Sequence, residues 1–291
     1  MALCKPTPNT IINGDCALVL KEFEPECIDL TVTSPPYDNL RDYEGYHFDF
    51  EAIAYQLFRV TKQGGVVVWV VGDETINGSE SGNSFKQALY FMEIGFNLHD
   101  TMIYEKDSLN MPCSNRYYQV QEYMFVFSKG GPKAANLLQT KTKHRGNNHS
   151  STTRQADGSL VNHKYETGKA YRNRGNVWRY GAGYMKTTND KYAYEHPAMY
   201  PEQLAKDHIL SWSNPGDLVL DPMCGSGTTL KMAKQSGRNY IGIDTSEKYC
   251  KLSQKRVERA QTPLLLEFGQ SNKSVQPTGG TVRQNELFPN E

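Results

Sequence analysis

A short apolar strand that runs directly into a glycine-rich turn is the feature that most restricts the fold of this chain. Residues 218–221 read Leu-Val-Leu-Asp, and residues 222–229 read Pro-Met-Cys-Gly-Ser-Gly-Thr-Thr. The two glycines let the backbone turn tightly and approach a ligand closely. Thr228 or Thr229 can begin the next helix, whose free amide groups favour a carboxylate. This strand–turn–helix unit predicts a site for a small ligand with an anionic end.

Further apolar segments repeat this alternation of strand and helix. Residues 66–71 form a continuous apolar run, of the kind that a parallel sheet buries on both faces. The segments 101–104 and 123–127 are expected to pair. The alternation implies an open, mostly parallel α/β sheet. Strands are expected at 10–15, 28–33, 66–71, 101–104, 123–127, 218–221 and 240–244, and helices at 50–60, 85–94, 201–212 and between 221 and 240.

Four of the expected strands end in polar residues, namely Asp15, Ser34, Asp221 and Asp244. Ligands of open α/β sheets lie at the carboxyl ends of strands, near a switch in strand order. Two of these residues come from each end of the chain, so they form one pocket only if both ends share a sheet. Asp221 can meet an amino group, and Asp244 is placed to accept hydrogen bonds from ribose hydroxyls. A dinucleotide is disfavoured, because Leu230 replaces the third glycine of its G-x-G-x-x-G fingerprint.

The strand at 28–33 runs into Ser34-Pro35-Pro36-Tyr37. An exocyclic amino nitrogen of a base is a poor nucleophile, because its lone pair is conjugated with the ring. The Ser34 hydroxyl and the Pro35 carbonyl can hold its hydrogens, and two prolines fix the turn so that these acceptors are already aimed. Tyr37 supplies a face on which an extruded base can stack. A rigid turn after a strand is the alternative when the motif is taken alone.

With the glycine turn and Thr33–Tyr37 in view, the chain resembles the amino-group DNA methyltransferases that use S-adenosylmethionine. The catalytic motif precedes the cofactor turn, as in the permuted β group of that family, and the resemblance covers roughly residues 10–260. It implies a circularly permuted, Rossmann-like methyltransferase sheet and direct methyl transfer without a covalent intermediate. Ser34, where adenine enzymes of the family usually place Asp, implies cytosine N4 as the target. Adenine N6 stays the alternative.

The resemblance also implies a set of site residues and assigns Asp15 to the adenine amino group of the cofactor. His196-Pro197 resembles the segment that closes the pocket over the methionine end of the cofactor, with a helix entry packed on the sheet as the alternative. Glu122 and Tyr123 match a family block near the target base. The catalytic residues are Ser34, Pro35, Pro36 and Tyr37, and the S-adenosylmethionine residues are Asp15, Thr33, Asp221, Pro222, Gly225, Ser226, Gly227, Thr228 and Asp244.

Net charge is formally zero, but it is unevenly distributed. Lys129 to Arg179 contains eleven Lys or Arg residues and two acidic residues, a net charge of +9, so the rest of the chain carries −9. Such a local positive surface attracts phosphates whatever the total charge. The DNA-binding candidates are Lys141, Lys143, Arg145, Arg154, Arg172, Arg174 and Arg179.

The basic segment also sets the expected domain organisation. We expect a target-recognition segment at 129–180, inserted between residues 1–128 and 181–262 of one discontinuous catalytic and cofactor-binding domain. A long loop without secondary structure of its own is either functional or disordered, and the basic and aromatic composition favours function. Residues 263–291 are expected to be a mobile tail.

The six cysteines, at positions 4, 16, 27, 113, 224 and 250, show no C-x-x-C pair and no spacing typical of a metal site. We therefore expect reduced thiols, no metal and a cytoplasmic protein. No apolar run is long enough to cross a membrane, and the amino terminus lacks a signal-peptide stretch.

Other functions use related features. Pro112-Cys113 resembles the nucleophile of cytosine-C5 methyltransferases, but their Glu-Asn-Val motif has only Gly175-Asn176-Val177 as a counterpart. A non-catalytic DNA-binding protein would keep the basic segment without needing the pocket residues. The expected partner is double-stranded DNA, while a cognate restriction endonuclease and a homodimer are left open.

Overall fold

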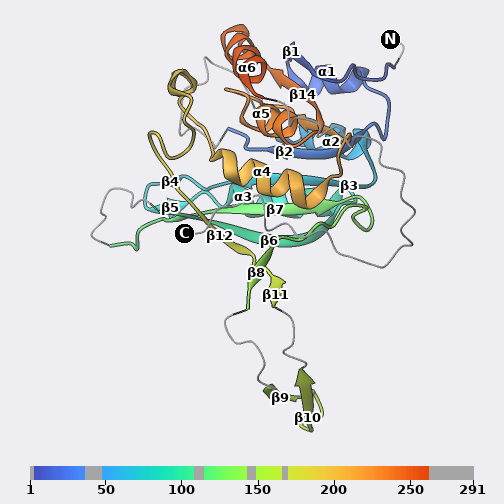
Figure 1. Cartoon of the computed structure of the whole chain (residues 1–291), viewed down its shortest axis with the longest axis vertical. Helices are drawn as coiled ribbons and strands as arrows, with labels where there is room; N and C mark the ends of the chain where they lie inside the picture. The colour runs from blue at the N-terminus through green and yellow to red at the C-terminus, as the bar shows by residue number, and fades with distance from the viewer. Residues whose placement is uncertain (1–2, 37–47, 108–114, 143–148, 166–169, 262–291) are drawn as a thin grey trace, which may run out of the picture.

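The computed structural model describes residues 3–36, 48–107, 115–142, 149–165 and 170–261. Tyr37, Lys143, Arg145 and the tail expected to be mobile at 263–291 lie outside these residues. An eight-stranded sheet of order β1-β14-β13-β2-β3-β7-β6-β12 crosses the molecule (Figure 1). Its strands are β1 (Thr10–Asn13), β2 (Ile28–Thr33), β3 (Thr61–Val71), β6 (Asn97–Lys106), β7 (Gln121–Ser128), β12 (Val177–Tyr180), β13 (Leu218–Asp221) and β14 (Asn239–Asp244).

Helices cover both faces of this sheet. Successive side chains of a strand point to opposite faces, and β3 shows the result. Val66, Val68 and Val70 pack in one buried cluster, whereas Val67, Trp69 and Val71 pack in the other. The second cluster contains α1 (Cys16–Glu22), α2 (Phe50–Val60) and α3 (Asn83–Glu93), and the first contains α4 (Glu202–Trp212), α5 (Thr228–Gln235) and α6 (Glu247–Arg259).

The expected pattern of strands and helices is confirmed in its main parts. The segments around 101–104 and 123–127 pair antiparallel within β6 and β7. The helix expected at 50–60 has those bounds, and the Asp49 carboxylate caps it by accepting from the Ala52 amide at 3.1 Å. The first strand ends earlier than expected, at Asn13, because Asp15 caps α1 instead of extending β1. Helices α1 and α6 were not predicted.

Both ends of the chain share the one sheet, as the converging strand ends require. Strand β1 pairs parallel with β14, and β2 pairs parallel with β13. From β2 the chain continues to β3 on one side, and from β13 it continues to β14 on the other. The strand order therefore switches between β2 and β13. At such a switch point an open α/β sheet has a crevice at its carboxyl edge.

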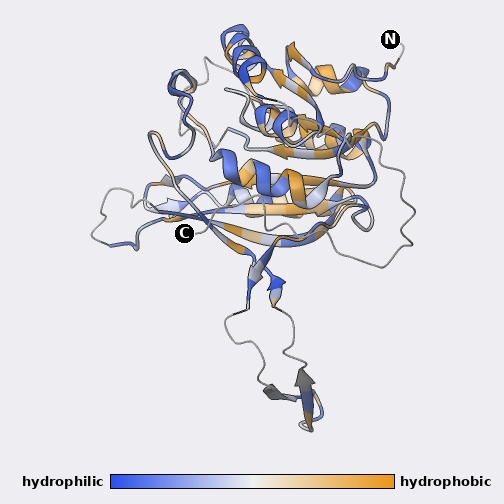
Figure 2. Ribbon diagram, in the orientation of Figure 1, coloured by the Kyte–Doolittle hydropathy of each residue, from blue (hydrophilic) through white to orange (hydrophobic). Residues whose placement is uncertain are grey.

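The segment expected at 129–180 contains a projection, made of two strand pairs, and a last strand, β12, that belongs to the main sheet. Strands β8 (Gln139–Lys141) and β11 (Tyr171–Asn173) pair as a ribbon that leaves the sheet, and beyond it β9 (His149–Arg154) pairs with β10 (Leu160–Tyr165) (Figure 1). Figure 2 shows that the β8–β11 ribbon is largely hydrophilic, in contrast to the apolar sheet. The last four residues, in β12, instead pair with β6 as an edge of the main sheet.

Three simple features bear on the class of protein. Within the described ranges, no helix is both long and apolar enough to span a membrane. The five cysteines that the structure places are free thiols. No group of three or more His, Cys, Asp or Glu side chains among the placed residues could hold a metal ion.

Candidate active site

The four polar strand ends meet at the carboxyl edge of the sheet. Asp15 follows β1, Asp244 ends β14, Asp221 ends β13 and Ser34 follows β2, and these four strands are neighbours in that order. All four strands run parallel, so their carboxyl ends lie on one edge. The structure thus brings the predicted cofactor residues of both chain ends together.

The glycine turn depends on two residues with positive φ. Gly225 has φ +49° and Gly227 has φ +79°, backbone conformations that residues other than glycine rarely adopt. A Cβ at Gly225 would lie 2.7 Å from Nε2 of His196, and one at Gly227 would lie 2.7 Å from Oγ of Ser253. Both glycines are therefore required by the backbone and by close packing.

Leu230 stands where a dinucleotide fingerprint has its third glycine, and the structure shows how this is accommodated. The close approach of helix and strand is made by Gly242 of β14 instead, where a Cβ would lie 2.4 Å from Cδ1 of Leu230. Leu230 itself is fully buried. The turn therefore packs tightly on the sheet without that third glycine.

Asp244 links the end of β14 to the glycine turn. Its Oδ2 accepts from the Gly225 amide at 2.8 Å, and its Oδ1 accepts from the Ser246 amide at 2.9 Å. Burial raises the pKa of this carboxyl, although both amide hydrogen bonds oppose the shift. Each carboxylate oxygen has a second lone pair, so Asp244 can also accept from a ligand hydroxyl.

Asp221 is more deeply buried, with 2% of its surface exposed. Its Oδ1 accepts from the Thr33 hydroxyl at 2.8 Å and from the Met223 amide at 3.3 Å, while the Tyr200 hydroxyl lies 3.5 Å from Oδ2. Burial raises the pKa of Asp221 to about 6 in spite of these donors. Thr229 fixes the next turn by donating to the Val32 carbonyl at 3.0 Å.

The remaining predicted cofactor residues lie at the same edge. Asp15 caps α1 by accepting from the Leu18 amide at 3.0 Å, a role that the sequence analysis missed. Pro222 is buried beside Asp221. Ser226 and Thr228 point toward α6, where both accept hydrogen bonds from Arg256.

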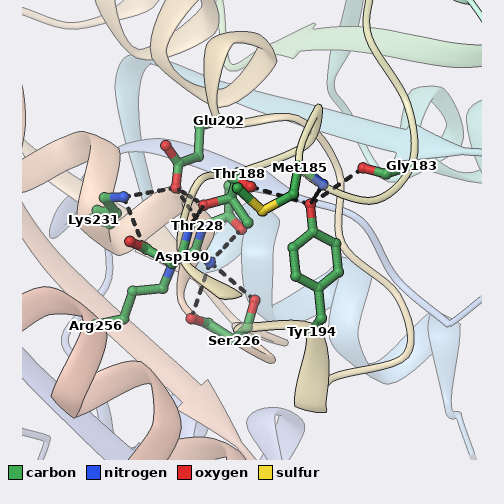
Figure 3. A network of polar contacts seen from close by, with 10 residues as sticks. All are labelled: Gly183, Met185, Thr188, Asp190, Tyr194, Glu202, Ser226, Thr228, Lys231 and Arg256. Atoms are coloured by element: carbon green, nitrogen blue, oxygen red, sulfur yellow. Dashed lines mark hydrogen bonds and ion pairs between the residues drawn. The ribbon is translucent and has the colours of Figure 1, made fainter. Parts of the chain in front are cut away.

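A largely buried network of ion pairs and hydrogen bonds contacts the glycine turn at Ser226 and Thr228 (Figure 3). The side chain of Arg256 is 0% exposed and pairs with Asp190 at 2.9 Å and with Glu202 at 2.5 Å. Lys231 lies 2.8 Å from each of the same two carboxylates. Burial alone would raise the pKa of Asp190, but the hydrogen bonds from Lys231 and Arg256 lower it.

Sequence reasoning did not find this network. A sequence signal for it existed, because Arg256 and Val257 lie on the buried side of an amphipathic helix, where a charge needs a partner. The partners themselves, Asp190 and Glu202, lie far away in the sequence.

His196 contacts the turn at Gly225. Its ring lies against Gly225 and contacts the Tyr249 ring at a centroid distance of 4.4 Å. Nδ1 of His196 accepts from the Ala198 amide at 3.2 Å, which leaves Nε2 as the nitrogen directed at the turn. This residue is thus placed both at the glycine turn and at the entry to α4, so it fits either of its two predicted interpretations.

The predicted catalytic turn lies on the other side of the switch point. Pro35 is buried, while Ser34 and Pro36 are partly exposed, next to the end of β3. Further along the sheet, a cavity of about 940 Å³ opens at the ends of β3 and β6 and the start of β7, and its lining includes none of residues 34–36. Its lining includes Glu122, which pairs with Lys106 at 2.5 Å, and Tyr123.

The predicted DNA-binding cations do not all behave alike. The side chains of Lys141, Arg154, Arg172 and Arg179 are exposed. Arg174 is different, because its guanidinium donates to the buried carboxylate of Asp207 at 2.9 Å and stacks over Trp178 at 4.7 Å. The Arg174 side chain is therefore engaged in the body of the protein and is 27% exposed, and its assignment to DNA binding stays a prediction.

Comparison with known proteins places this geometry in context. A family model described as DNA methylase (N6_N4_Mtase) matches residues 28–255. The orphan methyltransferase M.BamHII of Bacillus amyloliquefaciens is 57% identical over 244 residues, which cover 82% of this chain and 92% of that protein.

Two solved structures share the fold. The PvuII DNA methyltransferase, described as cytosine-N4-specific, has a TM-score of 0.62 at 20% identity. The match covers 92% of this chain and 89% of that protein. TTHA0409 of Thermus thermophilus, described as a putative DNA modification methylase and solved with S-adenosyl-L-methionine, has a TM-score of 0.57 at 23% identity. The match covers 86% of this chain and 95% of that protein. At these identities the likeness concerns the fold alone.

Proposed function

The chain belongs to the N6_N4_Mtase family of DNA methylases, and from this membership we propose that it methylates the exocyclic N4 of cytosine in duplex DNA, with S-adenosylmethionine as the methyl donor. One observation carries the proposal. The acidic strand ends Asp221 and Asp244 and the glycine turn lie beside the Ser34-Pro35 turn, across the switch point of a single sheet. The proposed donor site and the proposed acceptor site are thus adjacent.

The residues present fit the chemical groups of S-adenosylmethionine. Asp244 offers a carboxylate to ribose hydroxyls, and the amides of the first turn of α5 have no partner within the helix and suit the donor's carboxylate. We keep Asp15, Thr33, Asp221, Pro222, Gly225, Ser226, Gly227 and Thr228 as the other proposed residues of this site. When bound, S-adenosylmethionine supplies an electrophilic methyl group on a sulfonium sulfur.

The catalytic turn prepares the amino nitrogen for that methyl group. The Ser34 hydroxyl oxygen and the Pro35 carbonyl oxygen accept the two hydrogens of the amino group, which draws the nitrogen toward tetrahedral geometry and frees its lone pair. Strand β2, buried between β13 and β3, holds this turn in place before substrate arrives. Acceptors fixed in advance stabilise developing charge without reorganising during the reaction.

We propose that the cavity at the ends of β3 and β6 and the start of β7 receives the target base. Its volume, about 940 Å³, is within the range of small-molecule sites. A base inside a duplex cannot reach the edge of a sheet, so the target nucleotide has to be extruded. Glu122 and Tyr123 line the cavity and offer a carboxylate and a ring to the extruded base.

The choice of cytosine rests on Ser34, since adenine enzymes of this family usually have Asp there. Adenine N6 methylation on the same fold is the second candidate, because the family includes both activities. Nucleoside mass spectrometry of DNA treated with the pure enzyme decides between N4-methylcytosine and N6-methyladenine. If neither product forms, calorimetry shows no binding of S-adenosylmethionine and the protein still binds DNA, it is a DNA-binding protein without this catalytic function. For either product, we propose a role in DNA protection, with or without a partner nuclease.

We propose that the projecting segment binds the phosphate backbone. Lys141, Arg154 and Arg172 are exposed on its strands, and Arg179 is exposed where the segment returns to the sheet. Removing one cation that neutralises a phosphate should reduce the slope of log affinity against log salt by about 0.9. Replacing Lys141, Arg154 and Arg172 with Ala tests this, with Lys86→Ala on α3 as a matched surface control. An unchanged slope in the triple variant would contradict the assignment.

A further inference from the structure

The segment 183–196 joins β12 to the region of α4 and runs over the cofactor turn; we name it the strap. It contains the 3-10 helix η1 (Lys191–Glu195) and is organised by the hydroxyl of Tyr194. This hydroxyl accepts from the Met185 amide at 2.6 Å and lies 3.1 Å from the Thr188 carbonyl (Figure 3). The strap is therefore held in a defined conformation by its own hydrogen bonds.

The strap is attached to the body of the protein by the buried network around Arg256. On one side, Nη1 of Arg256 donates to the Ser226 carbonyl at 3.2 Å, the Ser226 hydroxyl at 3.0 Å and the Thr228 hydroxyl at 2.9 Å. On the other side, Nε donates to Asp190 of the strap at 2.9 Å. A guanidinium is planar and its donors have fixed directions, so one side chain fixes the position of the turn relative to the strap.

Lys231 completes the network from α5. Its ammonium lies 2.8 Å from Asp190 and 2.8 Å from Glu202 at the start of α4, and Thr188 of the strap donates to Glu202 at 2.6 Å. Two cations and two carboxylates balance in charge. Because the network is largely buried, removing one member leaves a charge without compensation, and the rest must rearrange.

We propose that Arg256 and Lys231 are positioning residues of the cofactor site, which fasten the strap to the glycine turn and so set the affinity for S-adenosylmethionine. The strap also places His196 against Gly225. The attachment of the strap through Arg256 and Lys231, which we call the clamp, therefore fixes both Gly225 and residues 226–228 of the turn. This inference rests on the proposed cofactor site, and it assigns to Arg256 and Lys231 an action through Ser226, Thr228 and the strap.

The first experiment measures the dissociation constant of S-adenosylmethionine by calorimetry. Arg256→Met keeps much of the side-chain length but removes all donors, and should weaken binding by tenfold or more. Arg256→Lys keeps the positive charge but lacks the planar set of N–H donors, and its dissociation constant should lie between those of the wild-type and Arg256→Met proteins. Val257→Ala is the control, because Val257 is a buried neighbour on α6 whose truncation destabilises the fold without touching the network. Wild-type affinity in a folded Arg256→Met protein overturns the proposal, as does an equal loss in Val257→Ala.

A milder variant serves if Arg256→Met does not fold. Asp190 is partly exposed, and Asp190→Asn removes the charge that holds the strap to Arg256 and Lys231. It should weaken S-adenosylmethionine binding severalfold. Hydrogen exchange of the protein without cofactor should show faster exchange both in the strap and in residues 225–230. Unchanged exchange in both segments overturns the clamp.

The two measurements separate failure of the clamp from failure of the proposed function. Hydrogen exchange without cofactor reports on the attachment alone, whatever the ligand is. If the wild-type protein does not bind S-adenosylmethionine but Asp190→Asn still loosens residues 225–230, the cofactor assignment fails and the attachment stands. If the wild-type protein binds and neither variant changes affinity, the clamp fails and the cofactor assignment stands.

Discussion

Replacing Asp221 with Asn should stabilise the cofactor-free protein at neutral and alkaline pH. The carboxyl of Asp221 is 2% exposed, and burial raises its pKa from 3.8 to about 6. An acid whose pKa is higher in the folded protein than in the unfolded chain binds its proton more tightly when folded. Stability therefore falls as the pH rises from 3.8 through about 6, and the full cost is present above that range.

The size of this cost follows from the pKa difference. One pKa unit corresponds to about 1.4 kcal/mol, so a shift from 3.8 to about 6 gives about 3 kcal/mol above the folded pKa. About 2 kcal/mol of it develops between about pH 4.5 and about pH 7.5. Asn keeps an oxygen that accepts from Thr33 and Met223, and its amide can donate to the Tyr200 hydroxyl. The variant thus avoids the cost of the charge and keeps the main contacts.

The measurement is urea unfolding of both proteins across this pH range, in the absence of cofactor. The difference between the two free energies of unfolding cancels the other titrating groups. It should shift by about 2 kcal/mol in favour of Asp221→Asn as the pH rises. A difference that stays constant with pH would refute the raised pKa. The same variant should bind S-adenosylmethionine more weakly, if Asp221 meets the donor's ammonium group.

Three further outcomes are expected. Gly227→Ala should lower the free energy of unfolding by about 1–3 kcal/mol and weaken binding of S-adenosylmethionine, because φ is +79° and the new Cβ would meet Ser253; calorimetry and thermal unfolding check this. Ser34→Ala should lower kcat by about 10²–10³ in single-turnover assays while leaving donor affinity unchanged, since it removes an acceptor used during transfer. Arg174→Ala should cost about 2–3 kcal/mol in urea unfolding by leaving the buried Asp207 without its cation, and the salt dependence of DNA binding should not change.

Much of the fold could be predicted because it depends on short-range patterns. The apolar run 66–71 has to be buried on both sides, and it lies within β3, which has helices on both faces. The helix at 50–60 was found by its periodicity, and Asp49 caps it. Helix α6 was missed because its sequence is strongly polar and only a narrow stripe around Cys250 and Val257 is buried.

The proposed catalytic and cofactor motifs could be picked out from the sequence because each is a continuous stretch that follows a strand. The order β1-β14-β13-β2 then confirms that the two ends of the chain form one edge. Charge alone could not separate Arg174 from its neighbours, because its role depends on Asp207, which lies 33 residues away. Composition likewise gave no reason to divide the basic segment before β12, which pairs with β6 in the main sheet.

The glycine turn depends on contacts that its own short sequence pattern does not contain. The backbone conformation of the turn is set by Gly225 and Gly227. Its position is set by Asp244, which accepts from the Gly225 amide, and by Arg256, which donates to Thr228. An apolar side chain in place of Arg256 could fill the same space, yet it could not give direction to the hydroxyls of Ser226 and Thr228. Buried ion pairs add little net stability, but their geometry is specific, and a site that must hold a charged cofactor gains from that specificity. The network therefore accounts for a buried arginine that the stability of α6 alone would not require.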